Sequence, residues 1–326
     1  MTTQPPPPES ASPALADGLS VAVTAIYAEG ETLILAAITG NVLAALKAAD
    51  PPAQMLVRAG TTQTAVRRIL DRVEARARRV VPTVLSEAYG RGHGLERRAA
   101  DQAVQDVLGR LASLRGGILR WVTGLWNRLT AAVGGQRDPR QAADQVLQGE
   151  AGRGITGFTD SHGRRWSLTA YVDQTVQHAA GNTAMDGWLQ RAQETGDLVV
   201  VRPTPTACPI CRPWVARILS ISGTDPDRPS VREARSAGLW HPNCQHPVAV
   251  WHPGFHWLHS RGRGGTQAMY EATQRERRIE RTLAHWERRL AVALDDVSKA
   301  SARRKVRQWR TALADHRRAY RLNALA

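Results

Sequence analysis

The chain has 326 residues, 42% of them hydrophobic, enough to bury one large core or two modest ones. Its 44 Lys and Arg exceed its 29 Asp and Glu, and the net charge of +15 favours a polyanionic partner, either nucleic acid or an acidic protein surface. An odd count of 3 cysteines argues against a secreted, disulfide-built protein. We expect no cleavable signal, because the start is proline-rich, and no membrane span, because charges such as Glu29, Glu31, Arg120 and Arg128 interrupt the apolar stretches.

The first segments predict a disordered leader followed by helices. Residues 1–13 are rich in proline and serine and are expected to lack structure. Thr61 or Thr62 is the expected cap of a helix that runs to about residue 88, with Pro82 kinking or dividing it. The glycines between residues 90 and 94 predict a turn, in which His93 is a solvated loop residue.

Apolar residues at steps of three and four predict one helical stripe between residues 95 and 133, with a bend at Gly116–Gly117. Packing against neighbouring helices explains this stripe better than a coiled coil or a membrane surface does. Asp138 followed by Pro139 predicts a capped helix start. Residues 14–150 are therefore expected to form a helical bundle or arm without a catalytic cluster.

Residues 151–254 predict a small α+β module. A hairpin with its turn at residues 161–163 precedes a helix that starts after Ser167 and ends near Gln193. Short strands are expected at 197–201 and 216–222, on either side of a cysteine-containing turn. The expected fold class is therefore α+β and mainly helical, with loops of this module pinned by cysteine and histidine.

The cysteines and two histidines of this module form a candidate metal site. Cys208 and Cys211 have the Cys-x2-Cys spacing that lets two thiolates reach one ion from a turn. Cys244 and His246 are two residues apart, so both point to one side of an extended segment. These four would complete a closed, structural zinc site, and His241 is the alternative fourth ligand. The competing interpretation is that the cysteines are small buried thiols and the histidines are hydrogen-bonding loop residues.

Several short motifs of the module occur together in a characteristic order. They are Gly157-Phe-Thr-Asp160, Gly163-Arg-Arg-Trp166, Tyr171, Cys211-x-Pro-Trp214, Ser222-Gly223 and Pro242-Asn-Cys244-x-His246. Over residues 152–254 this pattern resembles the phage minor capsid protein 2 family, which is related to the Mu F-like minor head proteins of tailed bacteriophages. The chain departs from the family where Val215-Ala216 follow Trp214, a place where a glycine is common, and Cys208 is not part of the shared pattern.

The resemblance implies a virion component, present in few copies, in the capsid interior or near the portal, after synthesis in the host cytoplasm. The implied partners are portal and major capsid proteins and packaged double-stranded DNA, with no membrane partner, and the implied state in the virion is oligomeric. The implied role is structural, in head assembly, and not enzymatic.

The C-terminal residues predict a basic helical tail. Residues 255–268 contain Arg-Gly-Arg-Gly-Gly and are expected to be a flexible hinge, and 269–326 form a long helical pattern broken near residues 294–298. From residue 261 onward, 17 Lys and Arg face 7 Asp and Glu, so the tail carries most of the excess charge. The candidate DNA- or partner-binding residues are Arg303, Arg304, Lys305, Arg307, Arg310, Arg317 and Arg318. The alternative is a solvated face with intrahelical ion pairs.

Two other functions compete with a structural role. The cysteine and histidine cluster also suits a zinc-stapled, metal-dependent nuclease of HNH or His-Cys type, in which a histidine is the general base beside a metal. Too few histidines remain for catalysis once a structural ion has taken its ligands. A sequence-specific DNA-binding regulator is disfavoured, because the chain has no clear helix-turn-helix or zinc-finger spacing.

Overall fold

The structure is a computed structural model that describes residues 10–94, 101–134, 136–159, 165–203, 210–242, 244, 246–253 and 267–325. Its helices are α1 (Ser20–Ala48), α2 (Pro52–His93), α3 (Asp101–Ala112), α4 (Leu114–Val133), α5 (Pro139–Arg153), α6 (Leu168–Gln193), α7 (Val231–Ser236), α8 (Gln267–Val292) and α9 (Asp296–Leu325). The strands are β1 (Ser10–Ala11), β2 (Thr156–Thr159), β3 (Arg165–Ser167), β4 (Leu198–Val201), β5 (Ile218–Ser220) and β6 (Val248–Val250). Two short 3-10 helices are η1 (Pro13–Ala16) and η2 (Arg212–Trp214). The expected mainly helical α+β class is confirmed.

The chain forms two compact units. Unit 1 contains Met1–Thr24, Ala77–Arg110 and Asp173–Glu271, and unit 2 contains Ala25–Arg76, Leu111–Val172 and Ala272–Ala326. The helices α1, α2, α3, α6 and α8 each supply residues to both units. The division expected from the sequence, at residues 13, 150, 254 and 268, stays a prediction about the organisation of the chain.

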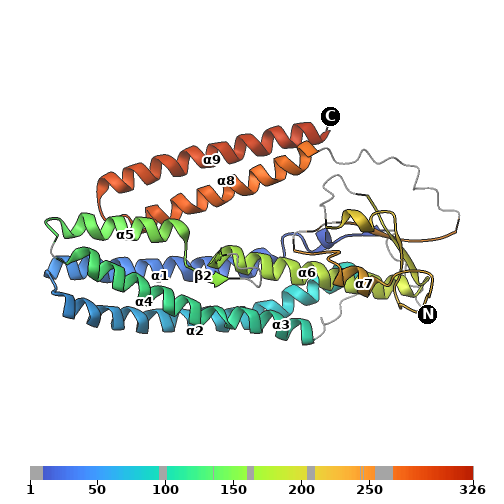
Figure 1. Cartoon of the computed structure of the whole chain (residues 1–326), viewed down its shortest axis with the longest axis horizontal. Helices are drawn as coiled ribbons and strands as arrows, with labels where there is room; N and C mark the ends of the chain where they lie inside the picture. The colour runs from blue at the N-terminus through green and yellow to red at the C-terminus, as the bar shows by residue number, and fades with distance from the viewer. Residues whose placement is uncertain are drawn as a thin grey trace. The chain divides into compact units, whose positions relative to one another are not determined.

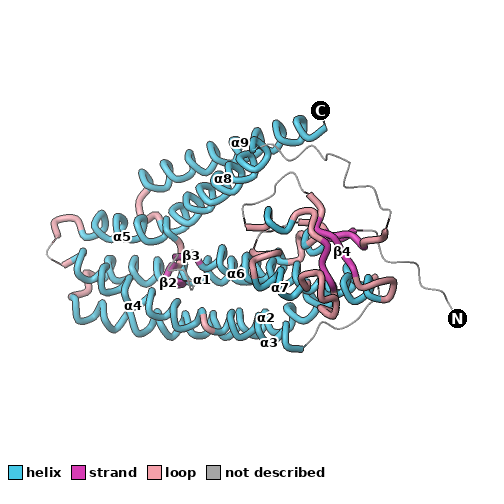
Figure 2. The backbone as a smooth tube through the Cα atoms, turned by 45° about the vertical axis from the view of Figure 1, so that its right-hand side comes forward, coloured by secondary structure: helices cyan, strands magenta, loops and turns pink. Residues whose placement is uncertain are grey.

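Unit 1 contains a four-stranded antiparallel sheet in the order β1-β6-β4-β5. Figure 2 shows strands of this sheet in magenta at the label β4. The strands β4 and β5 lie where the sequence predicts them, but β1 falls in the segment expected to be disordered. Ser10 and Ala11 pair with Ala249 and Val248, so they satisfy backbone groups along one side of β6. Ala11 is also 5% exposed and part of the apolar core under the sheet. The prediction of disorder for residues 10–13 was therefore wrong, whereas residues 1–9 lie outside the described residues.

Of the glycines expected to form a turn, Gly92 instead allows α2 to approach α6 closely within unit 1, and Gly187 does the same from α6. A Cβ added at Gly92 would lie 1.8 Å from the carbonyl oxygen of Ala184, and one added at Gly187 would lie 2.5 Å from that of Tyr89. His93 is 2% exposed and its ring stacks on Tyr89, with centroids 5.5 Å apart. The predicted turn and the predicted solvated histidine were both wrong, because the glycines serve helix packing and α2 continues to His93.

The helix α2 also begins earlier than the sequence indicates. It starts at Pro52, a favourable first position, and it continues through Pro82 without division. Thr61 and Thr62 do not cap the helix, because their hydroxyls donate to the carbonyls of Val57 and Arg58 one turn earlier. The predicted bend at Gly116–Gly117 is likewise displaced, since the break between α3 and α4 falls at residue 113.

In unit 2, α4 packs against α5 and β2. The predicted start of α5 is confirmed, since the Asp138 carboxylate accepts the Gln141 N–H at 2.9 Å and Pro139 opens the helix. The hairpin of β2 and β3 is confirmed as well, although its turn lies outside the described residues. The apolar stripe of α4 is buried, with Ile118, Val122 and Leu129 each fully covered. This stripe is therefore a packing face.

Of the helices within the described ranges, α1 alone is long and apolar enough to cross a membrane. The buried helix of a globular core passes the same test, and 44% of the apolar window of α1 is buried. Within unit 2, Glu31 of α1 is 5% exposed and accepts the Ile155 N–H at 3.0 Å. A buried, hydrogen-bonded carboxylate of this kind belongs to the inside of a protein core.

The basic tail of the sequence forms a helical hairpin of α8 and α9, which Figure 1 shows side by side in orange and red. The two helices are separated at residues 293–295, as the sequence predicts. The predicted hinge lies almost wholly outside the described residues, except that its last two residues already belong to α8.

Candidate metal centre and cationic hairpin

Three side chains from two loops of unit 1 converge on one point. Cys211 immediately precedes η2, Cys244 follows α7, and His246 leads into β6. Their exposed fractions are 0%, 6% and 1%, and both cysteines belong to the apolar core formed by α6 and the sheet. The second loop also carries Leu239 and Trp240, which are 2% exposed in the same core, so apolar packing and the contacts among these three side chains together fix where the loops lie.

The ligand atoms are close enough to share one ion. The Sγ atoms of Cys211 and Cys244 are 3.3 Å apart, and Cys244 Sγ is 3.3 Å from His246 Nδ1. The three ligand atoms all lie within 4.8 Å of one another. Zinc–sulfur and zinc–nitrogen bonds of about 2.3 and 2.0 Å give tetrahedral edges of about 3.6–3.8 Å, close to the spacing between these atoms. The burial of all three leaves little access for a substrate.

His241 lies beside this group. It hydrogen-bonds the Cys211 thiol, and this contact is the main reason that the His241 pKa is raised. Its Nδ1 lies 2.8 Å from the Pro242 carbonyl oxygen, so Nδ1 donates and the other ring nitrogen is left for a ligand role. The pKa of Cys211 is raised, first by its hydrogen bond with Cys244 and then by burial.

The residue before His241 carries backbone strain. Trp240 has a φ of +58°, a left-handed conformation that is unusual for a bulky side chain. It is 2% exposed, and its indole N–H donates to the His246 carbonyl oxygen at 3.0 Å. Arg235 lies over its ring at 4.9 Å. The surrounding contacts therefore hold a strained backbone that aims His241 and the Cys244–His246 segment at the same place.

Of the five predicted ligands, the structure brings together Cys211, Cys244 and His246, with His241 against Cys211. Cys208 lies outside the described residues. The fourth ligand, Cys208 or His241, therefore stays a prediction. Trp240 also helps to position the site. The sequence did not indicate this role, because no local pattern distinguishes this tryptophan from the others.

The seven predicted contact residues of α9 divide into two groups. Arg310 and Arg317 hold α9 against α8, because Arg310 pairs with Glu287 at 2.7 Å and Arg317 pairs with Glu276 and Glu280 at 2.6 and 2.7 Å. Arg318 lies 3.6 Å from Asp315 of its own helix, and Lys305 donates to Gln308. The other group has no such partner among the described residues and consists of Arg303, Arg304 and Arg307.

The turn between α8 and α9 is fixed to α5 by a buried carboxylate. Asp144 is 5% exposed and accepts both the Leu294 N–H and the Ser298 hydroxyl at 2.7 Å. One turn along α5, Gln148 and Arg289 exchange two hydrogen bonds of 2.9 Å. The hairpin is thus anchored at its turn by side chains of α5 that hydrogen-bond to backbone groups of the hairpin.

A second anchor joins α8 to the end of α5. Arg288 donates to the Ala151 and Gly152 carbonyl oxygens at 3.0 and 3.2 Å, and His285 donates to that of Gly152 from Nδ1 at 2.8 Å. Cationic and polar donors at a helix C-terminus satisfy carbonyls that have no partner within the helix. Burial raises the pKa of the nearby Glu31, against the attraction of Arg288. Burial lowers the pKa of His285.

The family model of phage minor capsid protein 2 matches residues 12–317. The chain belongs to the phage minor capsid protein 2 family. The match begins just after β1 and ends within α9, so it includes the cysteine and histidine loops and most of the hairpin. Comparisons with curated proteins and with solved structures gave no match.

As a member of a phage capsid family, this minor capsid protein is a virion component that assembles with other virion proteins. Sequence reasoning missed two residues that organise it, Asp144 and Glu31. Both are lone carboxylates in helices and carry no motif. The sequence signal for such residues is that they lie among apolar neighbours on one helical face. An acidic residue on a buried face needs an internal hydrogen-bond partner, so this position indicates a structural role.

Proposed function

We propose that this minor capsid protein is a structural component of head assembly in a tailed bacteriophage, positioned near the portal in contact with portal and major capsid proteins. The carrying observation is the family match over residues 12–317, nearly the whole chain. The hairpin supports contact with packaged DNA, because 15 Lys and Arg between residues 267 and 325 face 7 Asp and Glu. Such contact is independent of base sequence and weakens steeply with salt.

We assign the cysteine and histidine loops a structural zinc ion, held by Cys211, Cys244, His246 and a fourth ligand. The supporting observations are the mutual closeness of the three ligand atoms and their burial. Thiolate and imidazole are ligands that zinc prefers, and a closed site of this kind stabilises loops without catalysis.

Mass spectrometry of purified particles from the source strain tests the assembly role. The protein should be present in a fixed, low number of copies relative to the major capsid protein. Crosslinking within the particles should join it to the portal protein. Particles that mature and infect without this chain would contradict the proposal.

The nuclease alternative is tested by incubating the full chain with supercoiled plasmid in the presence of magnesium, manganese or zinc. We expect the plasmid to stay intact, because the candidate ligands are buried. Cleavage that His241→Ala abolishes, while the fold is preserved, would favour the enzyme over the structural role.

A further inference from the structure

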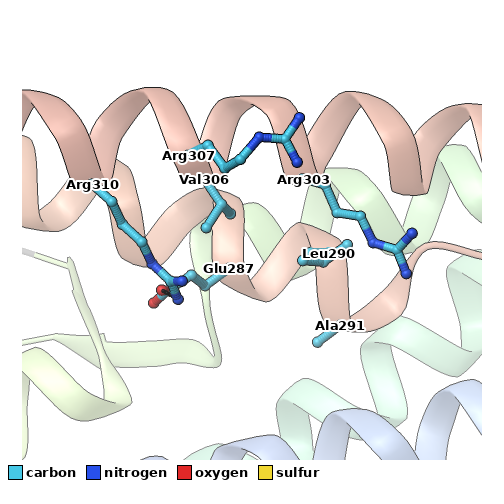
Figure 3. A pocket seen from close by; sticks show the side chains of 7 residues that line it. All are labelled: Glu287, Leu290, Ala291, Arg303, Val306, Arg307 and Arg310. Atoms are coloured by element: carbon cyan, nitrogen blue, oxygen red, sulfur yellow. Dashed lines mark hydrogen bonds and ion pairs between the residues drawn. The ribbon is translucent and has the colours of Figure 1, made fainter.

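A groove lies between α8 and α9 of the hairpin in unit 2. It has a volume of about 480 Å³ and is lined by Glu287, Leu290, Ala291, Arg303, Val306, Arg307 and Arg310 (Figure 3). The apolar residues Leu290, Ala291 and Val306 form its floor. Both free arginines of the lining, Arg303 and Arg307, are exposed on α9.

The charges of the groove are unequal. Glu287 is the one acidic residue of the lining, and it is neutralised by Arg310 at 2.7 Å. Neither Arg303 nor Arg307 has an ion pair or hydrogen bond to another side chain in the part of the chain that the structure describes. The acidic residues that flank them in sequence are already engaged, Asp295 with Ser298, Asp296 with Lys299 and Asp315 with Arg318. The groove therefore carries two positive charges that the protein itself does not balance.

The spacing of these charges suits a phosphate backbone. Arg303 and Arg307 are one helical turn apart, about 6 Å along the axis. Each guanidinium presents a planar fork of N–H donors, which matches phosphate oxygens in a bidentate arrangement. The apolar residues of the lining can pack against the sugar between two phosphates, and they offer no polar group with which to read a base.

An acidic protein is a weaker candidate for the same groove. Protein interfaces rely on a central cluster of apolar and aromatic residues, whereas DNA interfaces are polar and strongly positive. Among the described side chains of the hairpin, Val297 is the one exposed large hydrophobic residue, and it does not line the groove.

We propose that Arg303 and Arg307 clamp consecutive phosphates of double-stranded DNA over the floor of Leu290 and Val306, with Arg304 beside them. This inference rests on the proposed DNA contact and narrows it to one part of α9. The paired residues Arg310 and Arg317 instead keep the hairpin closed and contribute little to DNA affinity. The seven arginines and lysines expected from the sequence thus separate into residues that contact DNA and residues that pair with other side chains of the protein.

The test uses the full chain and a fluorescently labelled 20-base-pair duplex of mixed sequence, with anisotropy measured between 50 and 200 mM NaCl. The double variant Arg303→Gln and Arg307→Gln should bind about tenfold more weakly at 100 mM NaCl. Its plot of log affinity against log salt should lose about 1.8 of slope, because each phosphate contact contributes about 0.9.

The matched control is Arg275→Gln with Arg278→Gln. It removes the same charge from exposed positions of α8 that do not line the groove. This control should keep most of the affinity and slope, and both variants should show the thermal melting of the parent chain. An equal loss in the two variants would overturn the groove and leave a diffuse electrostatic attraction.

Two further outcomes also decide the question. Competition with poly-glutamate that is lost in the Arg303/Arg307 variant, while duplex binding is kept, would identify an acidic protein as the occupant and overturn the proposal. A parent chain that does not bind the duplex at all would reject both the groove and the proposed DNA contact. Its presence in virions would still support the assembly role.

Discussion

The cysteine and histidine loops of unit 1 and the α8–α9 hairpin of unit 2 are held in place by different means. In unit 1 two loop segments, one with Cys211 and one with Cys244 and His246, meet at buried thiols and an imidazole, where the cohesive contacts are few and concentrated. The hairpin is held by many separate contacts, such as Asp144 at its turn and Arg317 farther along α9. Loss of one contact should therefore be severe in the first region and graded in the second.

Removal of bound metal should give the largest effect and should separate the two regions. Treating the full chain with a strong chelator should lower the free energy of unfolding of the loops in unit 1 by about 5 kcal/mol or more, because metal binding supplies the energy that positions them. Hydrogen exchange should rise around Cys211 and Cys244 and stay unchanged in α9. Metal analysis that finds no zinc in a correctly folded sample would reject the site.

Gly92→Ala should cost about 3 kcal/mol or more. The added Cβ would meet the backbone of Ala184 at 1.8 Å, and two helices would have to move apart. Gly60→Ala is the matched control in the same helix, since nothing lies within 4 Å of its added Cβ. That control should stabilise by up to about 1 kcal/mol. Urea denaturation measures both, and equal stabilities would contradict the close crossing of α2 and α6.

Asp144→Ala should cost about 1–3 kcal/mol, because the Leu294 N–H and the Ser298 hydroxyl lose a buried acceptor. Hydrogen exchange should accelerate at the start of α9 and leave the sheet of unit 1 protected. Asp296→Ala, at an exposed position of the same turn, should cost about 0.5 kcal/mol. A similar cost for both variants would mean that Asp144 does not anchor the turn.

Ala216→Gly should stabilise unit 1 by up to about 1 kcal/mol. Residues 214–217 form a turn closed by the Arg217 N–H to the Trp214 carbonyl at 3.1 Å, and Ala216 has a φ of +64°. This is the third position of a type II turn, where glycine is favoured. Ala216→Val is the contrasting variant and should destabilise. Thermal melting that ranks valine above glycine would refute the left-handed conformation.

The smallest effect concerns pH. Burial lowers the pKa of His285, which Arg288 and Arg289 also disfavour as a cation. An imidazole with a folded pKa below its unfolded value of about 6.5 binds its proton more weakly when folded, so its contribution to stability falls as the pH drops below that value. His285→Asn keeps a donor near the position of Nδ1 and lacks this titration. The stability advantage of the parent chain over the variant should shrink between pH 7.5 and 5.5.

Local signals in the sequence predict much of the fold. The pair Asp138-Pro139 marks the start of α5, the apolar run at residues 198–201 gives β4, and helical periodicity gives α6 and the hairpin. The short helix α7 was missed although its signal was present. Ser230 and Glu233 form a capping box, a spacing of three residues that the sequence shows openly.

Features that depend on distant residues could not be predicted in this way. A glycine at position 92 is compatible both with a turn and with a helix that packs closely against α6. The sequence around it does not distinguish the two, because the close contact depends on the partner helix. Likewise Ser10 and Ala11 form a strand because they pair with one edge of β6. That pairing partner lies about 240 residues later in the chain, so no local signal indicates it. The cysteine and histidine spacing indicated the metal candidates, but the aim of His241 depends on the strained backbone at Trp240.

Every boundary between the two units falls inside a helix, namely α1, α2, α3, α6 or α8. Each unit is therefore a patchwork of three chain segments, and no cut at a single peptide bond releases either one whole. A ribosome must deliver Asp173–Glu271 before unit 1 has all its parts, and Ala272–Ala326 before unit 2 has its own. Nascent chains of this protein thus expose apolar helices until these segments have been synthesised, and early release in that period would favour aggregation over assembly.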